Sequence, residues 1–236
     1  DQFTSPPKVF ILRMRLVPII DASGVHALQK LADRCKRKGI ALIVSGLAVS
    51  ALPGLARAAP LPPVAGEMTL GPPKAPIQFV VYASASCPHC ARWWTTVLPE
   101  VRKRFIDTGK VRLVFREFLT PPTEFAAAGF ILARRIPGKY FGVLTTVFQR
   151  QEEIYRSEKL WEGLEAIGEQ YGLTKAQFKA ALNDPAALKA VNDRFFTAMN
   201  QNHVEVTPTF FVNGAPYEGE ADLAELSRAF AVAAKG

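Results

Sequence analysis

Two cysteines of this chain, separated by two residues, have the side-chain type and the spacing that redox chemistry requires. They form the motif Cys87-Pro88-His89-Cys90, directly after the apolar run 77–82. A strand end followed by a CxxC pair at the start of a helix is an arrangement in which a dithiol makes and breaks a disulfide. The motif therefore predicts thiol–disulfide exchange at Cys87 and Cys90.

A zinc site is the alternative, because a CxxC pair also supplies two of the four ligands that zinc needs. Outside the motif, the candidate thiol and imidazole ligands are Cys35, His26 and His203. None of them forms a second pair at the spacing of a zinc finger. We therefore predict no metal and no other cofactor.

The residue types within the motif assign different tasks to the two thiols. A thiolate attacks a disulfide, and its pKa falls at a helix N-terminus beside a cation. Pro88 suits the first helical turn, whose free N–H groups then point at Cys87. We predict Cys87 as the nucleophile and Cys90, a turn further and more enclosed, as the resolving thiol. His89 can present a donor or a positive charge to the thiolate, which makes the disulfide a stronger oxidant; alternatively it only faces solvent.

The composition bounds the kind of protein that carries this motif. With 236 residues and 49% hydrophobic content, the chain can build one sizeable core or two small ones. The net charge is +8, but residues 1–58 hold 9 Lys and Arg against 3 Asp and Glu, whereas residues 59–236 hold 20 against 18. Because the basic excess belongs to the front segment, we predict that nucleic acid is not a partner.

The front segment has the three-part layout of a secretory signal peptide. A basic stretch at 34–38 precedes the apolar run 40–52, and Ala56-Arg57-Ala58 follows it. We predict a candidate signal peptide over 40–58 that is cleaved after Ala58. The mature chain would then contain only the two motif cysteines, which suits an oxidising compartment. The alternative is that residues 40–46 form a buried strand.

The residues upstream favour that alternative, because they have a pattern of their own. The pattern predicts a strand over 8–16, a loop over 20–24, an amphipathic helix over 25–38 and a strand over 40–45. Residues 6–47 resemble part of a STAS domain, the module of sulphate-transporter tails and anti-sigma-factor antagonists. The loop Asp21-Ala22-Ser23-Gly24 carries the resemblance, and Ser23 matches the position phosphorylated in regulatory members. The match covers roughly half of such a domain, and two strands cannot close a core, so we interpret residues 1–47 as a fragment.

The elements that position the CxxC motif follow a region rich in proline and glycine. Residues 59–75 are predicted to form a linker. The next elements are a strand over 77–82, a helix over 90–106 that Pro99 kinks, and a strand over 111–117. The chain closes with a strand over 204–212, a hairpin at Asn213-Gly214 and a helix over 221–233.

Between these elements lies a long helical stretch, residues 121–203. Helices are predicted over 124–136, 139–151, 158–171, 175–182 and 185–200. Thr174 with Gln177 forms a capping box, and Asp184 precedes a proline at the first helical position. A parallel crossover needs only about a dozen residues, so most of this stretch is an inserted helical subdomain.

This order of elements and the segment Val206-Thr207-Pro208-Thr209-Phe210 resemble the DsbA family of periplasmic thiol–disulfide oxidoreductases. The resemblance covers about residues 75–236 and implies the α/β class: a thioredoxin-like fold with an inserted helical subdomain, here preceded by a partial STAS-like segment. It also implies that Pro208 is cis and faces the CxxC motif, and that the backbone of Thr207 binds the substrate peptide. A cis bond before proline costs only about 0.5–1 kcal/mol. The alternative is a trans proline at a strand edge.

The resemblance further implies a periplasmic enzyme that donates a disulfide to folding exported proteins. A membrane quinone-linked oxidase would be the redox partner that re-oxidises it. A disulfide isomerase or reductase on the same fold is the alternative. A protein of a different class, a non-catalytic STAS-type regulatory module, would be favoured by residues 6–47 alone.

The sequence departs from many thioredoxin-like enzymes six residues before the first cysteine. Those enzymes place a buried acid there, whereas this chain has Val81. Proton transfer at the resolving thiol then falls to water or to Glu117, although a charged residue at a strand end is usually solvated. Of the adjacent Trp93 and Trp94, one is expected in the core and the other at the rim of the site. The pairs at 140–141 and 195–196 are expected in the core of the insertion.

Overall fold

The computed structural model describes residues 8–13, 22–45, 61–219 and 221–235. The chain divides into two compact units, residues 1–55 and 56–236. Within the described ranges, no helix combines the length and the apolar character that crossing a lipid bilayer requires.

The first unit is one strand–helix–strand motif. Strand β1 (Val9–Arg13) pairs in parallel with β2 (Ala41–Ser45), and α1 (Ala22–Arg37) connects them. The prediction that Ser23 lies in a loop is wrong, because Ser23 belongs to the first turn of α1. Residues 41–45 of the apolar run form a strand, but Ala41 is exposed, whereas the alternative to the signal peptide predicted a buried strand over 40–46. The rest of that run and the predicted cleavage point after Ala58 lie outside the described residues.

The second unit is built on a five-stranded sheet whose order is β3-β5-β4-β6-β7. Only β4 and β5 run parallel, and the other neighbours are antiparallel. The strands are β3 (Met68–Leu70), β4 (Ile77–Ala83), β5 (Val111–Glu117), β6 (Thr209–Val212) and β7 (Ala215–Tyr217). Strand β3 corrects the linker prediction at residues 68–70. A three-residue edge strand takes its stability from the ladder with β5, which local composition does not reveal.

Both faces of the sheet are buried, which explains the nearly continuous apolar sequence of its central strand β4. Phe79 and Val81 of β4 pack on one face, and Val80 and Tyr82 pack on the other. The first face is covered by α2 (Pro88–Thr96), by helices of the insertion and by α9 (Leu223–Ala233). The CxxC motif therefore follows the end of the central strand β4, whose residues lie in the enclosed core.

The predicted helix over 90–106 is divided into three pieces. Helix α2 ends at Thr96, a short α3 (Leu98–Val101) follows, and one π-helical turn, η1 (Arg102–Ile106), completes the segment. Pro99 explains the break, because proline cannot donate the backbone hydrogen bond that would continue α2. The kink predicted at Pro99 is thus a helix boundary.

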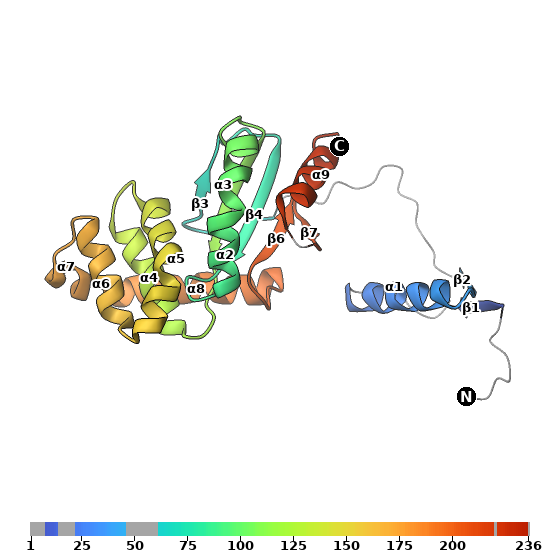
Figure 1. Ribbon diagram of the computed structural model, residues 1–236, viewed down its shortest axis with the longest axis horizontal. Helices are drawn as coiled ribbons and strands as arrows, with labels where there is room; N and C mark the ends of the chain where they lie inside the picture. Colours follow the sequence, from blue (N-terminus) through green and yellow to red (C-terminus); the bar gives the residue numbers. More distant parts are fainter. Residues whose placement is uncertain (1–7, 14–21, 46–60, 220, 236) are drawn as a thin grey trace. The chain divides into compact units, whose positions relative to one another are not determined.

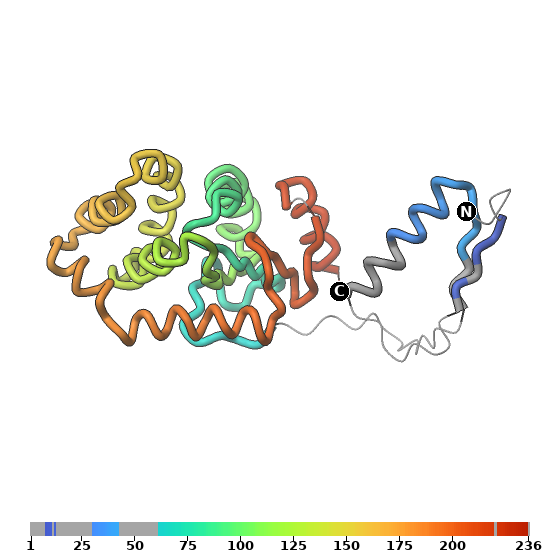
Figure 2. The backbone as a smooth tube through the Cα atoms, turned by 90° about the horizontal axis from the view of Figure 1, so that it is seen from below, coloured from blue at the N-terminus to red at the C-terminus, as the bar shows by residue number. Residues whose placement is uncertain are grey.

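The inserted helices gather at one side of the sheet, and the last of them runs back along it (Figure 1). They are α4 (Thr123–Arg135), α5 (Tyr140–Ser157), α6 (Leu160–Gln170), α7 (Lys175–Leu182) and α8 (Pro185–Asn202). Figure 2 shows α8 leading from this helical group to the strands of the sheet. The capping box of Thr174 and Gln177 and the cap at Asp184 are confirmed.

Two predictions for the insertion need correction. Helix α5 continues to Ser157 and does not end at Gln151, so Gln151 lies well inside it. Phe195 stacks edge-on against Phe118 with ring centroids 4.9 Å apart, but Phe196 is 54% exposed and does not belong to the core. Two adjacent helical residues point about 100° apart, and on α8 only the direction of Phe195 faces the packed core, so Phe196 is left in solvent.

The terminal hairpin forms at the predicted residues. Asn213 and Gly214 have φ values of 49° and 85°, the left-handed conformation that a tight two-residue hairpin requires. Strand β6 is shorter than predicted and begins at Thr209, directly after Pro208. The loop that ends at Pro208 therefore lies at the N-terminal end of β6, beside the central strand β4.

Candidate active site

The CxxC motif lies at the junction between β4 and α2. Strand β4 ends at Ala83, and Cys87 caps the N-terminus of α2 with Pro88 at the first helical position. The backbone N–H of Cys90 donates to the sulfur of Cys87 at 3.4 Å. The first N–H groups of a helix have no partner within the helix, so the Cys87 sulfur takes the place of that partner.

The two thiols have opposite acid–base properties. The hydrogen bond with the Cys90 side chain, outweighing burial, lowers the pKa of Cys87 to about 5, and backbone amides add to this effect. Burial raises the pKa of Cys90 far above its usual value, and the neighbouring Cys87 raises it further. Cys87 is 7% exposed and Cys90 is 1% exposed, so Cys90 is the more enclosed of the two thiols, as predicted. At neutral pH the reduced pair therefore consists of one thiolate and one thiol.

His89 contributes to the site through its backbone. Its amide is one of the groups that lower the pKa of Cys87, after the larger effects of the Cys90 side chain and of the Thr207 hydroxyl. The imidazole is exposed and lines a groove beside α2. That the His89 imidazole stabilises the thiolate of Cys87 stays a prediction.

The peptide bond between Thr207 and Pro208 is cis, which excludes the alternative of a trans proline. The sulfur of Cys87 lies 3.4 Å from the carbonyl oxygen of Thr207, to which it donates a hydrogen bond when it is protonated. Residues 120 positions apart in the sequence thus meet at the reactive sulfur. The loop presents backbone polar groups beside Cys87, the arrangement by which an extended peptide can be bound next to the reacting atom.

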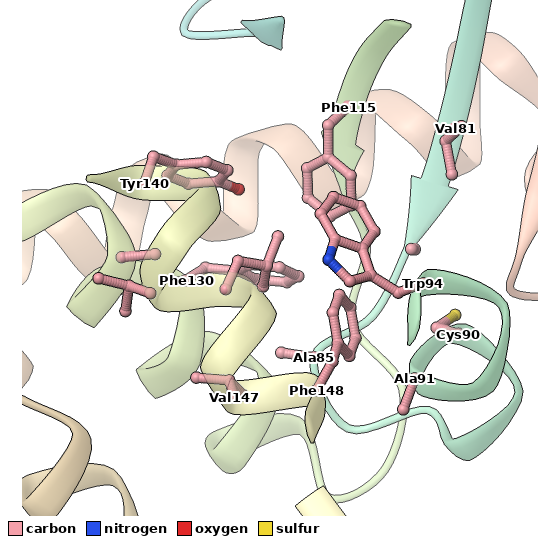
Figure 3. Close-up of a cluster of buried hydrophobic side chains, with 14 of the residues drawn as sticks. Val81, Ala85, Cys90, Ala91, Trp94, Phe115, Phe130, Tyr140, Val147 and Phe148 are labelled. Carbon is pink, nitrogen blue, oxygen red and sulfur yellow. The ribbon is translucent and has the colours of Figure 1, made fainter. Parts of the chain in front are cut away.

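A groove of about 520 Å³ lies beside these residues. Its lining consists of His89, Arg92, Trp93, Thr96, Val97, Val206, Thr207, Pro208, Thr209, Phe210, Tyr217 and Gly219. Trp93 is the tryptophan at the rim, although its ring is largely buried and its Nε1 donates to the carbonyl oxygen of Ala221. Trp94 lies in the core with Phe115 and Phe148, as Figure 3 shows.

Glu117 does not have the environment expected of a charge at a strand end. It is 2% exposed, and its Oε1 accepts hydrogen bonds from Arg134 Nε at 2.6 Å and from Tyr140 Oη at 2.9 Å. Its Oε2 accepts from Arg194 Nε at 2.6 Å. Both oxygens are therefore engaged in joining β5 to the insertion. Among the described residues, no hydrogen bond links this carboxylate to either cysteine of the motif.

Sequence reasoning missed two residues of α5 that contact the loop before Cys87. Gln151 and Tyr155 both donate hydrogen bonds to backbone carbonyl groups of this loop. The available signal was a glutamine at a buried position of an otherwise apolar helical stripe. The predicted helix ended at Gln151, so the sequence pattern did not place this glutamine within a helical stripe.

The opposite acidities of the two thiols can be measured directly. We expect a titration of the reduced protein near pH 5 when thiolate absorbance in the ultraviolet is followed. The Cys90→Ala variant should titrate at higher pH, because the hydrogen bond with the Cys90 side chain makes the largest contribution to the low pKa of Cys87. Cys87→Ala is the control and should lack the transition near pH 5. A wild-type protein without a transition near pH 5 would contradict this account.

Comparison with known proteins gives two family matches. The model of a thioredoxin family matches residues 64–231, and the STAS domain model matches residues 2–51. The chain is similar to a protein of Rickettsia prowazekii with the provisional name protein-disulfide oxidoreductase, at 31% identity over 153 residues. That alignment covers 64% of this chain and 56% of the relative. A Rickettsia conorii protein with the same provisional name is 32% identical over 150 residues, which are 53% of its length. The chain thus spans about half the length of these curated relatives.

Solved structures agree with the family match. The structure is similar to the crystal structure of Wolbachia pipientis alpha-DsbA1, with a TM-score of 0.66 and 27% identity over 74% of this chain and 94% of that chain. It also resembles oxidised BdbD from Bacillus subtilis, with a TM-score of 0.66 over 76% of this chain and 99% of that chain. At 20% identity the second likeness concerns the fold alone.

Proposed function

The chain belongs to the thioredoxin family, with a fold like that of DsbA proteins, and from this premise we propose that it is a thiol–disulfide oxidoreductase that donates a disulfide to folding exported proteins. The observation that carries the proposal is the lowered pKa of Cys87 beside the enclosed Cys90. Stabilising the thiolate stabilises the reduced form, and a disulfide whose reduced form is stabilised is a strong oxidant.

The two thiols take part in two exchange steps. A substrate thiolate attacks the sulfur of Cys87, the bond between Cys87 and Cys90 breaks, and Cys90 leaves and takes up a proton. A second substrate thiolate then attacks the substrate sulfur of the mixed disulfide and releases Cys87 as a thiolate. The substrate is oxidised by two electrons and the enzyme pair is reduced by two. The low pKa of Cys87 makes it a good leaving group in the second step.

The remaining predicted site residues support this reaction around the sulfur atoms. Pro88 starts the helix whose amides face Cys87, and His89 supplies one of those amides and an exposed imidazole. Thr207 and Pro208 would bind the substrate peptide by backbone pairing in the groove beside α2. We assign the substrates to exported proteins of the periplasm, and re-oxidation to a membrane quinone-linked oxidase.

The reduction potential distinguishes this proposal from its alternative. We expect equilibration against glutathione buffers to give a value near about −120 mV, as for strong oxidants, whereas a value near about −270 mV would favour a reductase. The potential should fall by about 30 mV per pH unit above pH 5, because one proton then accompanies two electrons, and by about 59 mV per unit below it. A steeper slope that persists at neutral pH would mean that Cys87 is protonated there.

Catalysis is tested with a reduced, unfolded protein that contains two cysteines. We expect the oxidised chain to form that disulfide at a rate proportional to its concentration. If instead it only rearranges wrong disulfides while its own cysteines stay reduced, the isomerase alternative is correct.

A further inference from the structure

The loop between β4 and α2 is held by side chains of the inserted helix α5. The amide nitrogen Nε2 of Gln151 donates to the carbonyl oxygen of Ala85 at 2.7 Å and lies 3.4 Å from the carbonyl oxygen of Cys87. One helical turn further, the hydroxyl of Tyr155 donates to the carbonyl oxygen of Ser86 at 2.9 Å. Two side chains of one helix therefore bind three consecutive carbonyl groups, the last of which belongs to the nucleophile.

Gln151 lies in a stripe that is otherwise apolar. The buried residues of α5 are Tyr140, Val143, Leu144, Val147, Phe148, Gln151 and Ile154. Gln151 is 3% exposed. Burying an amide costs free energy unless its donors and acceptors are paired, and an apolar side chain of similar size would pack at this position without that cost. The glutamine therefore contributes something other than packing, and its amide donates to the active-site loop.

The loop is also closely packed against the insertion. Ala85 belongs to the same cluster of buried hydrophobic side chains as Val147 and Phe148 of α5, which Figure 3 shows. On α4, a Cβ added to Gly129 would lie 3.1 Å from the Cβ of Ala85, closer than ordinary contact. The backbone before Cys87 is thus enclosed by the two inserted helices α4 and α5. Among the contacts of the described residues, only α5 donates side-chain hydrogen bonds to the carbonyl groups of this backbone.

We propose that Gln151, assisted by Tyr155, is a positioning residue through which the helical insertion sets the redox properties of the Cys87 and Cys90 pair. Binding the carbonyl groups of residues 85 and 87 fixes the backbone on both sides of the Cys87 side chain. The sulfur then stays within hydrogen-bond distance of the Cys90 amide, which can donate to the thiolate. The biological meaning of this role rests on the proposed function, but the chemistry at the sulfur does not.

Loss of the contacts from Gln151 and Tyr155 would reduce the stability of the Cys87 thiolate more than the stability of the fold. The N–H groups at the start of α2 stabilise a negative charge only while the sulfur faces them, and this effect falls off within the first turn. If the loop rotates, the thiolate loses part of this stabilisation even when the helix remains intact. The reduced form is then less favoured, and the disulfide becomes a weaker oxidant.

The test compares Gln151→Met with the matched control Gln149→Met in the full chain. Gln149 lies on the same helix but is exposed. For Gln151→Met we expect the pKa of Cys87 to rise by about one unit and the equilibrium constant with glutathione to shift about tenfold, equivalent to about 30 mV toward the reducing side. The control should keep both wild-type values. Neither readout depends on the direction of electron flow in the cell, so failure of the proposed function would leave this result standing.

The milder variant Tyr155→Phe covers the case in which Gln151→Met does not fold. It removes one hydroxyl, and we expect shifts in the same direction, with the equilibrium constant changed about threefold, equivalent to about 14 mV. Folded variants that keep the wild-type pKa and equilibrium constant, even with a lower melting temperature, would overturn the proposal, because the contacts of α5 would then be only structural. Equal shifts in the control would overturn it as well.

Discussion

Replacement of Cys87 by serine is expected to reduce disulfide donation to the rate of buffer alone. The hydroxyl of serine is not ionised at neutral pH and cannot form a mixed disulfide, so both exchange steps are lost. The measurement is oxidation of a reduced, unfolded substrate by the variant and by the wild-type chain. Cys35→Ser is the matched control, because Cys35 is a buried thiol of the first unit and should not affect the rate.

The Cys90→Ser variant should fail in a different way. It lacks the resolving thiol and has no disulfide to donate, so we test it with a substrate that already carries a disulfide. The Cys87 sulfur should attack that disulfide and release one substrate thiolate, and the resulting mixed disulfide should persist for identification by mass spectrometry because no Cys90 thiol displaces it. If Cys87→Ser accumulated such adducts and Cys90→Ser did not, the assignment of nucleophile and resolving thiol would be reversed. If both variants donated disulfides at the wild-type rate, the chain would not be a CxxC oxidoreductase.

The second large effect is expected on stability, at Glu117. Its carboxylate is buried and accepts hydrogen bonds from Arg134, Arg194 and Tyr140. Glu117→Ala should lower the free energy of unfolding by about 3–5 kcal/mol, because it leaves two partly or largely buried guanidinium groups and a phenol without their partner. The measurement is equilibrium unfolding in urea.

A matched control separates this effect from the loss of any carboxylate. Glu100 pairs with Arg104 at 3.2 Å on the surface, where both side chains are about half exposed. Exposed pairs of this kind contribute little, so Glu100→Ala should keep the wild-type midpoint. A Glu117→Ala protein as stable as the control would mean that the buried cluster contributes no net stability. A Glu117→Ala protein that stays folded but loses the low pKa of Cys87 would instead restore a role for Glu117 at the thiols.

Much of the architecture was predictable because its signals are local. The cap at Asp184, the capping box of Thr174 and the hairpin at Asn213 each depend on a few neighbouring residues, and all three are confirmed. The fold class was predictable as well, since a CxxC motif after a strand and a long helical insertion before a Thr-Pro segment resemble one family. The family match over residues 64–231 agrees with that prediction.

The errors concern features that depend on distant partners. Strand β3 was assigned to a linker, because its stability comes from pairing with β5 and not from its own composition. The environment of Glu117 was unpredictable for the same reason, since Arg134 and Arg194 belong to two different inserted helices. Phe196 was predicted in the core, but only the neighbouring Phe195 faces the partners that pack against α8, and the sequence of one helix does not reveal where those partners lie.

The sequence by itself determined where the two thiols lie and predicted their order of reaction, because the spacing of Cys87 and Cys90 at a helix start places one sulfur at the amide donors and encloses the other. Only the tertiary structure decided what surrounds the sulfur. Thr207 arrives from 120 residues away, and Gln151 holds the loop from the inserted helix. Hydrogen bonds and desolvation act over a few ångströms in space whatever the separation along the chain, so the acidity of Cys87 is a property of the folded protein.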